Sequence, residues 1–400
     1  MSAGASLLHL RADRLGSLRE LLRQRGLRAA LVHAQGGALG AATRSNACLR
    51  MFVDWDGVES PSTLLVEPGR CTLIVSNPFQ LHAARQLAQV DAVVFAAPEL
   101  LGETVRELLA MSEEHVASVG QVGWPEMQWQ TVQSLQRALP LLRWEDIAPE
   151  LDRWRAAKTV PEVEALANAA ALCDALFTRF PAFLGADREA WKTQRELEHF
   201  ALIAGAEYCK TWLTIAPAAQ QPQYLPHENR RRPEPGDQVL LGVMLKLDGY
   251  WGHAIRMGSY ERALPLHRKL HGIAREMFDT GLSAFDGASD LSEVEAALQT
   301  ILSRELPDVA AADIFRFRSG HGLGLSYEEP RSVAAFPQYA DPTDPGRPET
   351  LKPVSGAMFE LHPNFFVKEL GGAALGDMVH VGASGSRRLL ETPLDLMVWG

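Results

Sequence analysis

Histidine and glutamate side chains in the second half of the chain have the types and spacing that acid–base or metal chemistry requires. His321 stands between two glycines, so its imidazole lies beside bare backbone that a ligand can approach closely. Glu328 follows within the reach of a short strand. A neutral imidazole can deprotonate water near neutral pH, and a carboxylate can bind a cation or, when buried, donate a proton. Taken alone, His321 also fits a purely structural histidine.

A predicted β-hairpin carries the next candidate. Residues 238–247 and 250–257 are apolar β runs separated by Asp248-Gly249, a pair that favours a type I′ turn. Because strand side chains alternate with a period of two, His253 shares a face with Trp251, where an apolar side chain is expected.

Another predicted strand, residues 358–362, presents Glu360 and His362 two positions apart and therefore on one face. A carboxylate beside an imidazole is suited to acid–base catalysis or to ligand binding. Two polar side chains on a solvated sheet face are the alternative interpretation.

The chain is too long for one ordinary core, so we expect two domains with a boundary near residue 150. In residues 1–150, short strands alternate with helices, which predicts an α/β domain. In residues 151–400, the helix pairs expected near 160–205 and 264–305 are each followed by β-rich segments. This order predicts a duplicated ααββ unit in an α+β domain.

Composition excludes several classes of partner. The net charge is −10 and the longest basic run is Arg230–Arg232, which argues against nucleic acid. No apolar run approaches the ~20 residues of a membrane span, and the N-terminus does not resemble a signal peptide. The four cysteines are scattered, as expected for reduced thiols in a cytoplasmic protein.

Three ordered landmarks carry a family resemblance. They are Ala157-Lys-Thr-Val-Pro-Glu at a helix entry, Pro235-Gly-Asp before the hairpin, and Gly371-Gly-Ala-Ala-Leu-Gly-Asp-Met-Val near the end. Together they resemble the pita-bread superfamily of methionyl and Xaa-Pro aminopeptidases, prolidases, creatinase and ectoine hydrolase, over nearly the whole chain. The resemblance implies a creatinase-like N-terminal α/β domain, residues 1–150, and a pita-bread catalytic domain, residues 151–400.

The peptidases of this superfamily hold two metal ions with two Asp, one His and two Glu side chains. Carried over by position, these ligands fall on Gly242, His253, His321, His362 and Gly376. Two divalent ions repel each other and need bridging carboxylates to offset the repulsion. Since glycine offers no side chain, the resemblance predicts that the two-metal site is lost.

Creatinase and ectoine hydrolase work without metal on small, charged, non-peptide molecules, and Leu325-Ser-Tyr327 resembles the corresponding segment of ectoine hydrolase. We therefore expect a non-peptidase hydrolase that cleaves a C–N bond. His227 or His321 would act as general base, and Glu328 and Glu360 would bind a cationic group or donate a proton. Residues expected to contact the substrate are Tyr327, Trp251, Arg316 and Arg318, although solvated surface arginines are a simpler explanation of the last two.

The same positions also suggest a site for a single metal ion in place of two. His253, His321 and His362 together could hold one Zn²⁺ or Fe²⁺, or they could bind substrate as neutral imidazoles with no cofactor at all. Three histidines around iron would also suit an oxidase or oxygenase, and a binding protein that has lost its activity is a third class. The partners expected are a small-molecule substrate and, from the resemblance, a second copy of the chain in a homodimer.

Overall fold

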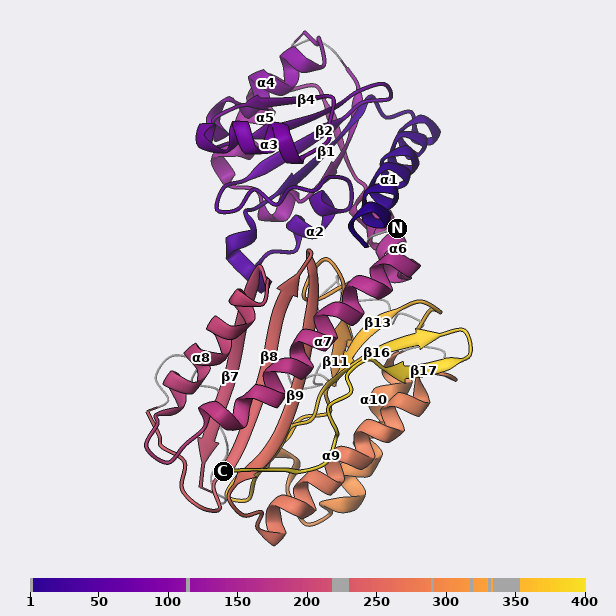
Figure 1. The fold of residues 1–400 in the computed structure, drawn as a ribbon. Helices are drawn as coiled ribbons and strands as arrows, with labels where there is room; N and C mark the ends of the chain where they lie inside the picture. The colour runs from indigo at the N-terminus through magenta and orange to yellow at the C-terminus, as the bar shows by residue number, and fades with distance from the viewer. Residues whose placement is uncertain are drawn as a thin grey trace. The chain divides into compact units, whose positions relative to one another are not determined.

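The computed structural model describes residues 3–112, 116–217, 230–288, 291–316, 319–329, 332–333 and 353–400. It divides into two compact units, Met1–Arg155 with Leu325–Tyr327, and Ala156–Gly324 with Glu328–Gly400. Both are drawn in Figure 1. No helix of the described residues is long and apolar enough to cross a bilayer.

The first unit is an α/β domain built on a six-stranded mixed sheet. Its order is β4-β3-β2-β1-β5-β6, in which β1 pairs antiparallel with β2 and parallel with β5. The strands are rich in buried Val, Leu and Ile, and helices bury apolar side chains against them, as the alternating pattern predicts. The strands are β1 (Ala29–Ala34), β2 (Ser62–Val66), β3 (Cys71–Val75), β4 (Ala92–Phe95), β5 (Ser118–Val122) and β6 (Arg143–Asp146), and the helices α1 (Ala3–Arg25), α2 (Ser45–Arg50), α3 (Leu81–Leu87), α4 (Leu101–Leu108), α5 (Trp129–Ala138) and α6 (Ala148–Ala156).

The second unit begins with two helices and a hairpin. Thr159 and Glu162 form a capping box at the start of α7 (Val160–Phe183), which α8 (Ala190–Ile203) follows. Then come β7 (Tyr208–Ala216), β8 (Gln238–Leu247) and β9 (Tyr250–Tyr260), in a sheet of order β18-β9-β8-β7. Asp248 and Gly249 have φ of 50° and 85°, as a type I′ turn requires. Figure 1 shows α7 passing over β8 and β9, and α8 lying along the edge strand β7.

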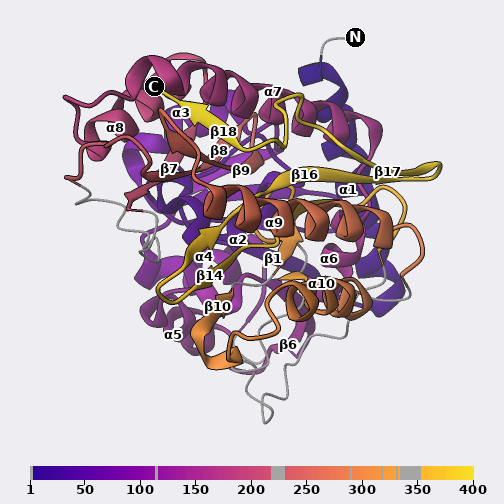
Figure 2. The same cartoon turned by 90° about the horizontal axis from the view of Figure 1, so that it is seen from below.

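The second half repeats the order of two helices followed by strands. The helices α9 (Pro265–Ala284) and α10 (Leu291–Glu305) lie side by side, as Figure 2 shows. They bury Phe278 and Leu298 in one apolar core with Leu361 and Phe365 of the strand region. This arrangement confirms the predicted duplication of two helices followed by strands. The strands are β10 (Ile314–Arg316), β11 (Gly320–Gly322), β12 (Ser332–Val333), β13 (Met358–Leu361), β14 (Phe365–Val367), β15 (Gly371–Ala373), β16 (Asp377–Gly382), β17 (Gly385–Arg388) and β18 (Met397–Trp399).

Two details differ from the sequence-based expectation. The spacing Thr193-Gln-Arg-Glu196 predicts a capping box at the start of a helix, but α8 begins three residues before Thr193. The Thr193 hydroxyl instead donates to the carbonyl oxygen of Phe183 at 2.8 Å. The start of α8 is instead held by the Ala190 amide, which donates to the carbonyl of Arg231. The charged sequence near the boundary at residue 150 predicts a connector between the domains, but residues 151–156 are helical and belong to α6.

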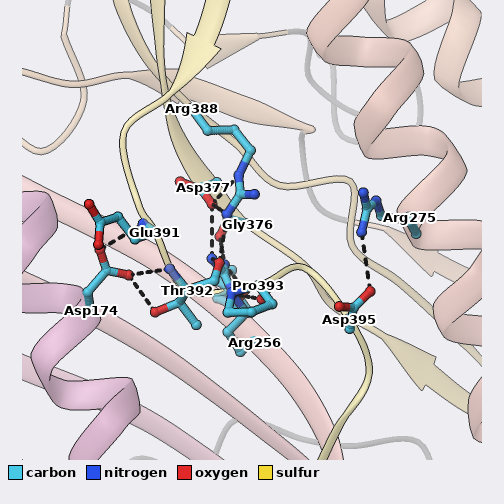
Figure 3. Close-up of polar contacts among 11 residues, drawn as sticks. Asp174, Arg256, Arg275, Gly376, Asp377, Arg388, Glu391, Thr392, Pro393 and Asp395 are labelled. Atoms are coloured by element: carbon cyan, nitrogen blue, oxygen red, sulfur yellow. Dashed lines mark hydrogen bonds and ion pairs between the residues drawn. The ribbon is translucent and has the colours of Figure 1, made fainter.

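Beside the candidate residues, a short bridge joins β9 of the four-stranded sheet to the residue before β16 of the five-stranded sheet, whose order is β12-β11-β13-β16-β17. Ile255 of β9 and Gly376 exchange backbone hydrogen bonds of 3.0 Å in each direction. Figure 3 shows how the neighbouring Asp377 is held, with Arg256 and Arg388 converging on its carboxylate. The Arg256 Nη2 and Arg388 Nε atoms both lie 2.9 Å from Asp377 Oδ2. This buried ion-pair network fixes β16 against β9, and with it the backbone around Gly376.

Candidate active site

Strand register brings the candidate histidines together from three segments. His321 of β11 lies directly opposite Glu360 of β13 in an antiparallel pair. His362 follows β13 and its amide donates to the carbonyl of Ser319 at 2.7 Å. His253 comes from β9, on the other side of the Ile255 bridge described above. Residues far apart in sequence therefore meet where the four-stranded and five-stranded sheets join.

All three imidazoles converge on one carboxylate oxygen. Glu360 Oε2 lies 3.0 Å from His253 Nδ1, 3.4 Å from His321 Nε2 and 3.2 Å from His362 Nε2. Glu360 is fully buried, and His321 is 1% exposed. The ring centroids of His253 and His321 are 5.6 Å apart with an interplanar angle of 23°. The sequence predicted these four residues as candidates, and the structure places them in one cluster, called here the His–Glu cluster.

Neighbouring groups assign protons to two of the rings. His321 Nδ1 lies 3.1 Å from the Gly322 carbonyl oxygen, which can only accept, so Nδ1 carries a proton and Nε2 faces Glu360. Asn364 accepts from the Leu375 amide through Oδ1, which turns its NH₂ group toward His362 Nδ1 at 3.5 Å. That nitrogen is then the acceptor, so in the neutral ring the proton of His362 sits on Nε2.

Trp212 of β7 is a wall of the site that the sequence interpretation missed. It lies opposite Gly242 in the β7–β8 register, and its ring is 5.6 Å from the His253 ring. A Cβ built at Gly242 would be 3.2 Å from Trp212 Cε3, so the indole covers the place where the resemblance expects an Asp. The signal in the sequence was a tryptophan in the strand that precedes the predicted hairpin. Local sequence does not show that this strand pairs with β8, so it does not place Trp212 at the site.

Gly376 makes room for Glu360. A Cβ built at Gly376 would lie 2.5 Å from Glu360 Oε1 and 3.1 Å from the Cβ of His362. A carboxylate at position 360 and any side chain at position 376 therefore compete for the same space. Gly242 and Gly376 are two of the four positions where the resemblance expects carboxylates, and the space beside them is taken by the Trp212 indole and by the carboxylate of Glu360.

The remaining candidates stand outside this cluster as the structure describes it. Trp251 is buried, its ring packs against Tyr208 at 5.5 Å, and its amide donates to the Gly324 carbonyl. Arg316 is buried too, which rules out the solvated surface arginine, and its guanidinium pairs with Glu295 of α10 at 2.8 Å.

Four further candidates are not brought to the cluster by any described contact. Glu328 is half-buried after β11 and is not among the donors that converge on one point. Tyr327 lies in the short segment grouped with the first unit. His227 and Arg318 lie outside the described residues. Their expected roles remain predictions.

A model of metallopeptidase family M24 matches residues 164–383, more than half of the chain. The chain belongs to this family. It is 25% identical over 163 residues to the putative dipeptidase YkvY of Bacillus subtilis (strain 168), which covers 41% of this chain and only 40% of that relative. The prolidase from Pyrococcus horikoshii OT3 superposes with a TM-score of 0.79 at 15% identity, over 96% of this chain and 100% of that one.

The M24 fold also occurs outside proteins named as peptidases. The N-terminal domain of the FACT complex subunit SPT16 from Cicer arietinum matches with a TM-score of 0.71 at 13% identity, covering 99% of each chain. At these identities the solved structures establish the shared fold alone. Any activity of this M24 chain depends on the residues of its own site.

The donors present do not fit the family's pair of metal ions. Gly242 and Gly376 occupy the first and last of the five positions where the resemblance places metal ligands. Among the described residues whose donor atoms converge, Glu360 is the one carboxylate. One carboxylate cannot offset the repulsion between two divalent ions a few ångströms apart. A single ion is a better match, because ligand atoms of His253, His321 and Glu360 all lie within 4.8 Å of one another.

Proposed function

We propose that this M24 protein is a hydrolase that cleaves a C–N bond in a small polar molecule other than a peptide. The observation that carries the proposal is the His–Glu cluster, in which three imidazoles surround the buried carboxylate of Glu360. The three histidines stand at positions where the resemblance places metal ligands. The named relatives, a putative dipeptidase and a prolidase, support C–N hydrolysis as the reaction type. The lost carboxylates at Gly242 and Gly376 argue for a substrate unlike theirs.

The reaction adds water to the carbon of the C–N bond. A new C–O bond forms, the C–N bond breaks, and the proton taken from water ends on the leaving nitrogen. In a metal-free site, His321 would accept this proton at Nε2, because its Nδ1 already carries a proton held by the Gly322 carbonyl. Glu360, 3.4 Å away, would stabilise the imidazolium that results.

A divalent ion, if bound, would supply a water of lowered pKa and polarise the bond under attack. His253, His321 and Glu360 would hold it, because their ligand atoms lie within 4.8 Å of one another, whereas the sequence predicted His362 in place of Glu360. His321 would then be a ligand, and proton transfer would pass to His227 or Glu328, the remaining candidates. Trp212 would flank the substrate, and its ring face suits a cationic or planar group.

Hydrolysis is tested by screening ureas, amidines, cyclic amides and N-substituted amino acids for release of ammonia or amine, beside Xaa-Pro dipeptides. We expect turnover of a non-peptide class and a loss of roughly 10²–10⁴-fold in kcat for His321→Ala. Dipeptides as the best substrates, or full activity of His321→Ala, would contradict the proposal.

A second candidate is oxidation by a single iron ion. Two His and one carboxylate form the ligand set of many non-haem Fe²⁺ oxygenases, and His253, His321 and Glu360 offer that set. Substrate-dependent oxygen consumption by the Fe²⁺-loaded protein, lost in Glu360→Gln, would favour it over hydrolysis. Specific ligand binding with neither reaction would favour the third class, a binding protein. A small-molecule ligand and a homodimer, as the resemblance implies, complete the proposal.

A further inference from the structure

The spacing of the donor atoms in the His–Glu cluster matches that of a coordination sphere. Ligand atoms ~2.1 Å from a metal lie about 3.0 Å apart in an octahedron and about 3.4 Å apart in a tetrahedron. The distances from Glu360 Oε2 to His253 Nδ1 and His321 Nε2 are 3.0 and 3.4 Å. These three residues form the group whose ligand atoms all lie within 4.8 Å of one another.

Proton positions distinguish His321, which can bind a metal ion, from His362, which contacts Glu360 instead. A metal ligand must present a lone pair, and His321 Nε2 does so because its proton is on Nδ1, beside the Gly322 carbonyl. His362 is the opposite case, since Asn364 directs its NH₂ group to Nδ1 and leaves the proton on Nε2, 3.2 Å from Glu360. His362 therefore contacts and orients the carboxylate, as groups around a metal ligand commonly do.

The carboxylate of Glu360 occupies a space that the surrounding structure leaves open for it. Glu360 is fully buried and occupies the space next to Gly376 that a side chain at that position would need. A buried carboxylate is costly in an apolar environment unless cationic or hydrogen-bonding groups surround it. Glu360 on β13 thus places a carboxylate beside Gly376, where the resemblance expects one at the start of the neighbouring strand β16. Gly242 has no side chain to supply the oxygen donor that the resemblance expects there.

We propose that the protein binds one divalent transition-metal ion through His253, His321 and Glu360, with His362 as a positioning residue for Glu360. The ligand set differs from the two-metal set of the peptidases and from the three histidines expected from sequence. It has one anionic oxygen and two neutral nitrogens, which suits one Zn²⁺ or Fe²⁺ and leaves coordination positions open. The proposal concerns the same cluster as the proposed hydrolase but does not require turnover.

The test is metal stoichiometry of tag-free protein. Chelator-treated protein is titrated with Zn²⁺ or Co²⁺, desalted and analysed for metal per chain, and Co²⁺ absorption reports the ligand environment. We expect about one ion for wild type and close to none for His253→Ala, His321→Ala and Glu360→Gln. The exposed His82→Ala is the matched histidine control and should keep one ion.

His362→Gln distinguishes a positioning residue from a ligand. Its amide NH₂ can still face Glu360, so we expect one ion per chain with affinity weakened about 10–100-fold. Loss of binding equal to that of His253→Ala would overturn the role given to His362, and two ions or none in wild type would overturn the site itself. Thermal unfolding of each chelated variant shows whether it is folded. One ion without hydrolysis would support this site and contradict the proposed reaction.

Discussion

Replacing Gly376 by alanine should disturb the site through one steric contact. The added Cβ would lie 2.5 Å from Glu360 Oε1, whereas real Cβ atoms essentially never come closer than 3.0 Å. Glu360 would have to move by several tenths of an ångström inside a fully buried environment. Overpacking of this kind costs about 1–3 kcal/mol, and the displaced carboxylate would leave its contacts with His253 and His362.

The assay is a double-mutant cycle by thermal or urea unfolding. Gly376→Ala alone should lower the melting temperature by about 2–4 °C for each kcal/mol lost. In a Glu360→Ala background the 2.5 Å contact is absent, while the contacts with the Cβ atoms of His362 and Ile255 at 3.1 and 3.2 Å remain, so the same substitution should cost less. The coupling free energy should be about 1–3 kcal/mol. Gly272→Ala is the control, because a Cβ there meets nothing within 4 Å and alanine favours the helix by up to ~1 kcal/mol.

Additive effects at positions 376 and 360, with a coupling below about 0.5 kcal/mol, would refute the reasoning. So would a Gly376→Ala variant that keeps both its melting temperature and its metal affinity. Either result would mean that Glu360 does not occupy the space next to Gly376.

Three further predictions concern other parts of the chain. Trp212→Ala should raise KM more than it lowers kcat, because the indole flanks the His253 ring at 5.6 Å and supplies no acid or base; an unchanged KM would remove it from the binding site. Burial lowers the pKa of His33 to about 4. The unfolded state therefore binds its proton first, and about 3 kcal/mol of stability should be lost as pH falls from about 6.5 to 4. Unfolding midpoints of His33→Gln should vary less with pH in that window, and an unchanged slope would contradict this. Asp377→Ala should destabilise the second unit by about 3–5 kcal/mol, since it leaves Arg256 buried without its carboxylate; a loss below 1 kcal/mol by urea unfolding would contradict the ion-pair account.

Local signals in the sequence determine much of the fold. The Asp248-Gly249 turn and the Thr159 capping box predicted a hairpin and a helix entry, and both occur. His321, Glu360 and His362 could be selected because a glycine-flanked histidine and a period of two are visible without a structure.

What the sequence could not supply depends on register between distant strands. Gly320 suggested open backbone for a ligand, yet a Cβ there would lie 2.3 Å from the Glu360 carbonyl oxygen, so the glycine serves close strand packing. Glu360 was expected to act beside the histidines, but its central position follows from the pairing of β11 with β13. The role of Trp212 required the β7–β8 register, which no local pattern encodes.

The central question for this M24 chain is how many metal ions it binds and which residues hold them. The most direct measurement is anomalous diffraction at the zinc edge from crystals of the full chain grown with excess Zn²⁺. We expect one strong peak bounded by His253, His321 and Glu360, with His362 in contact with the carboxylate of Glu360 but not with the ion. Two peaks about 3.5–4 Å apart, as in a two-metal hydrolase, or no peak at this cluster, would contradict it.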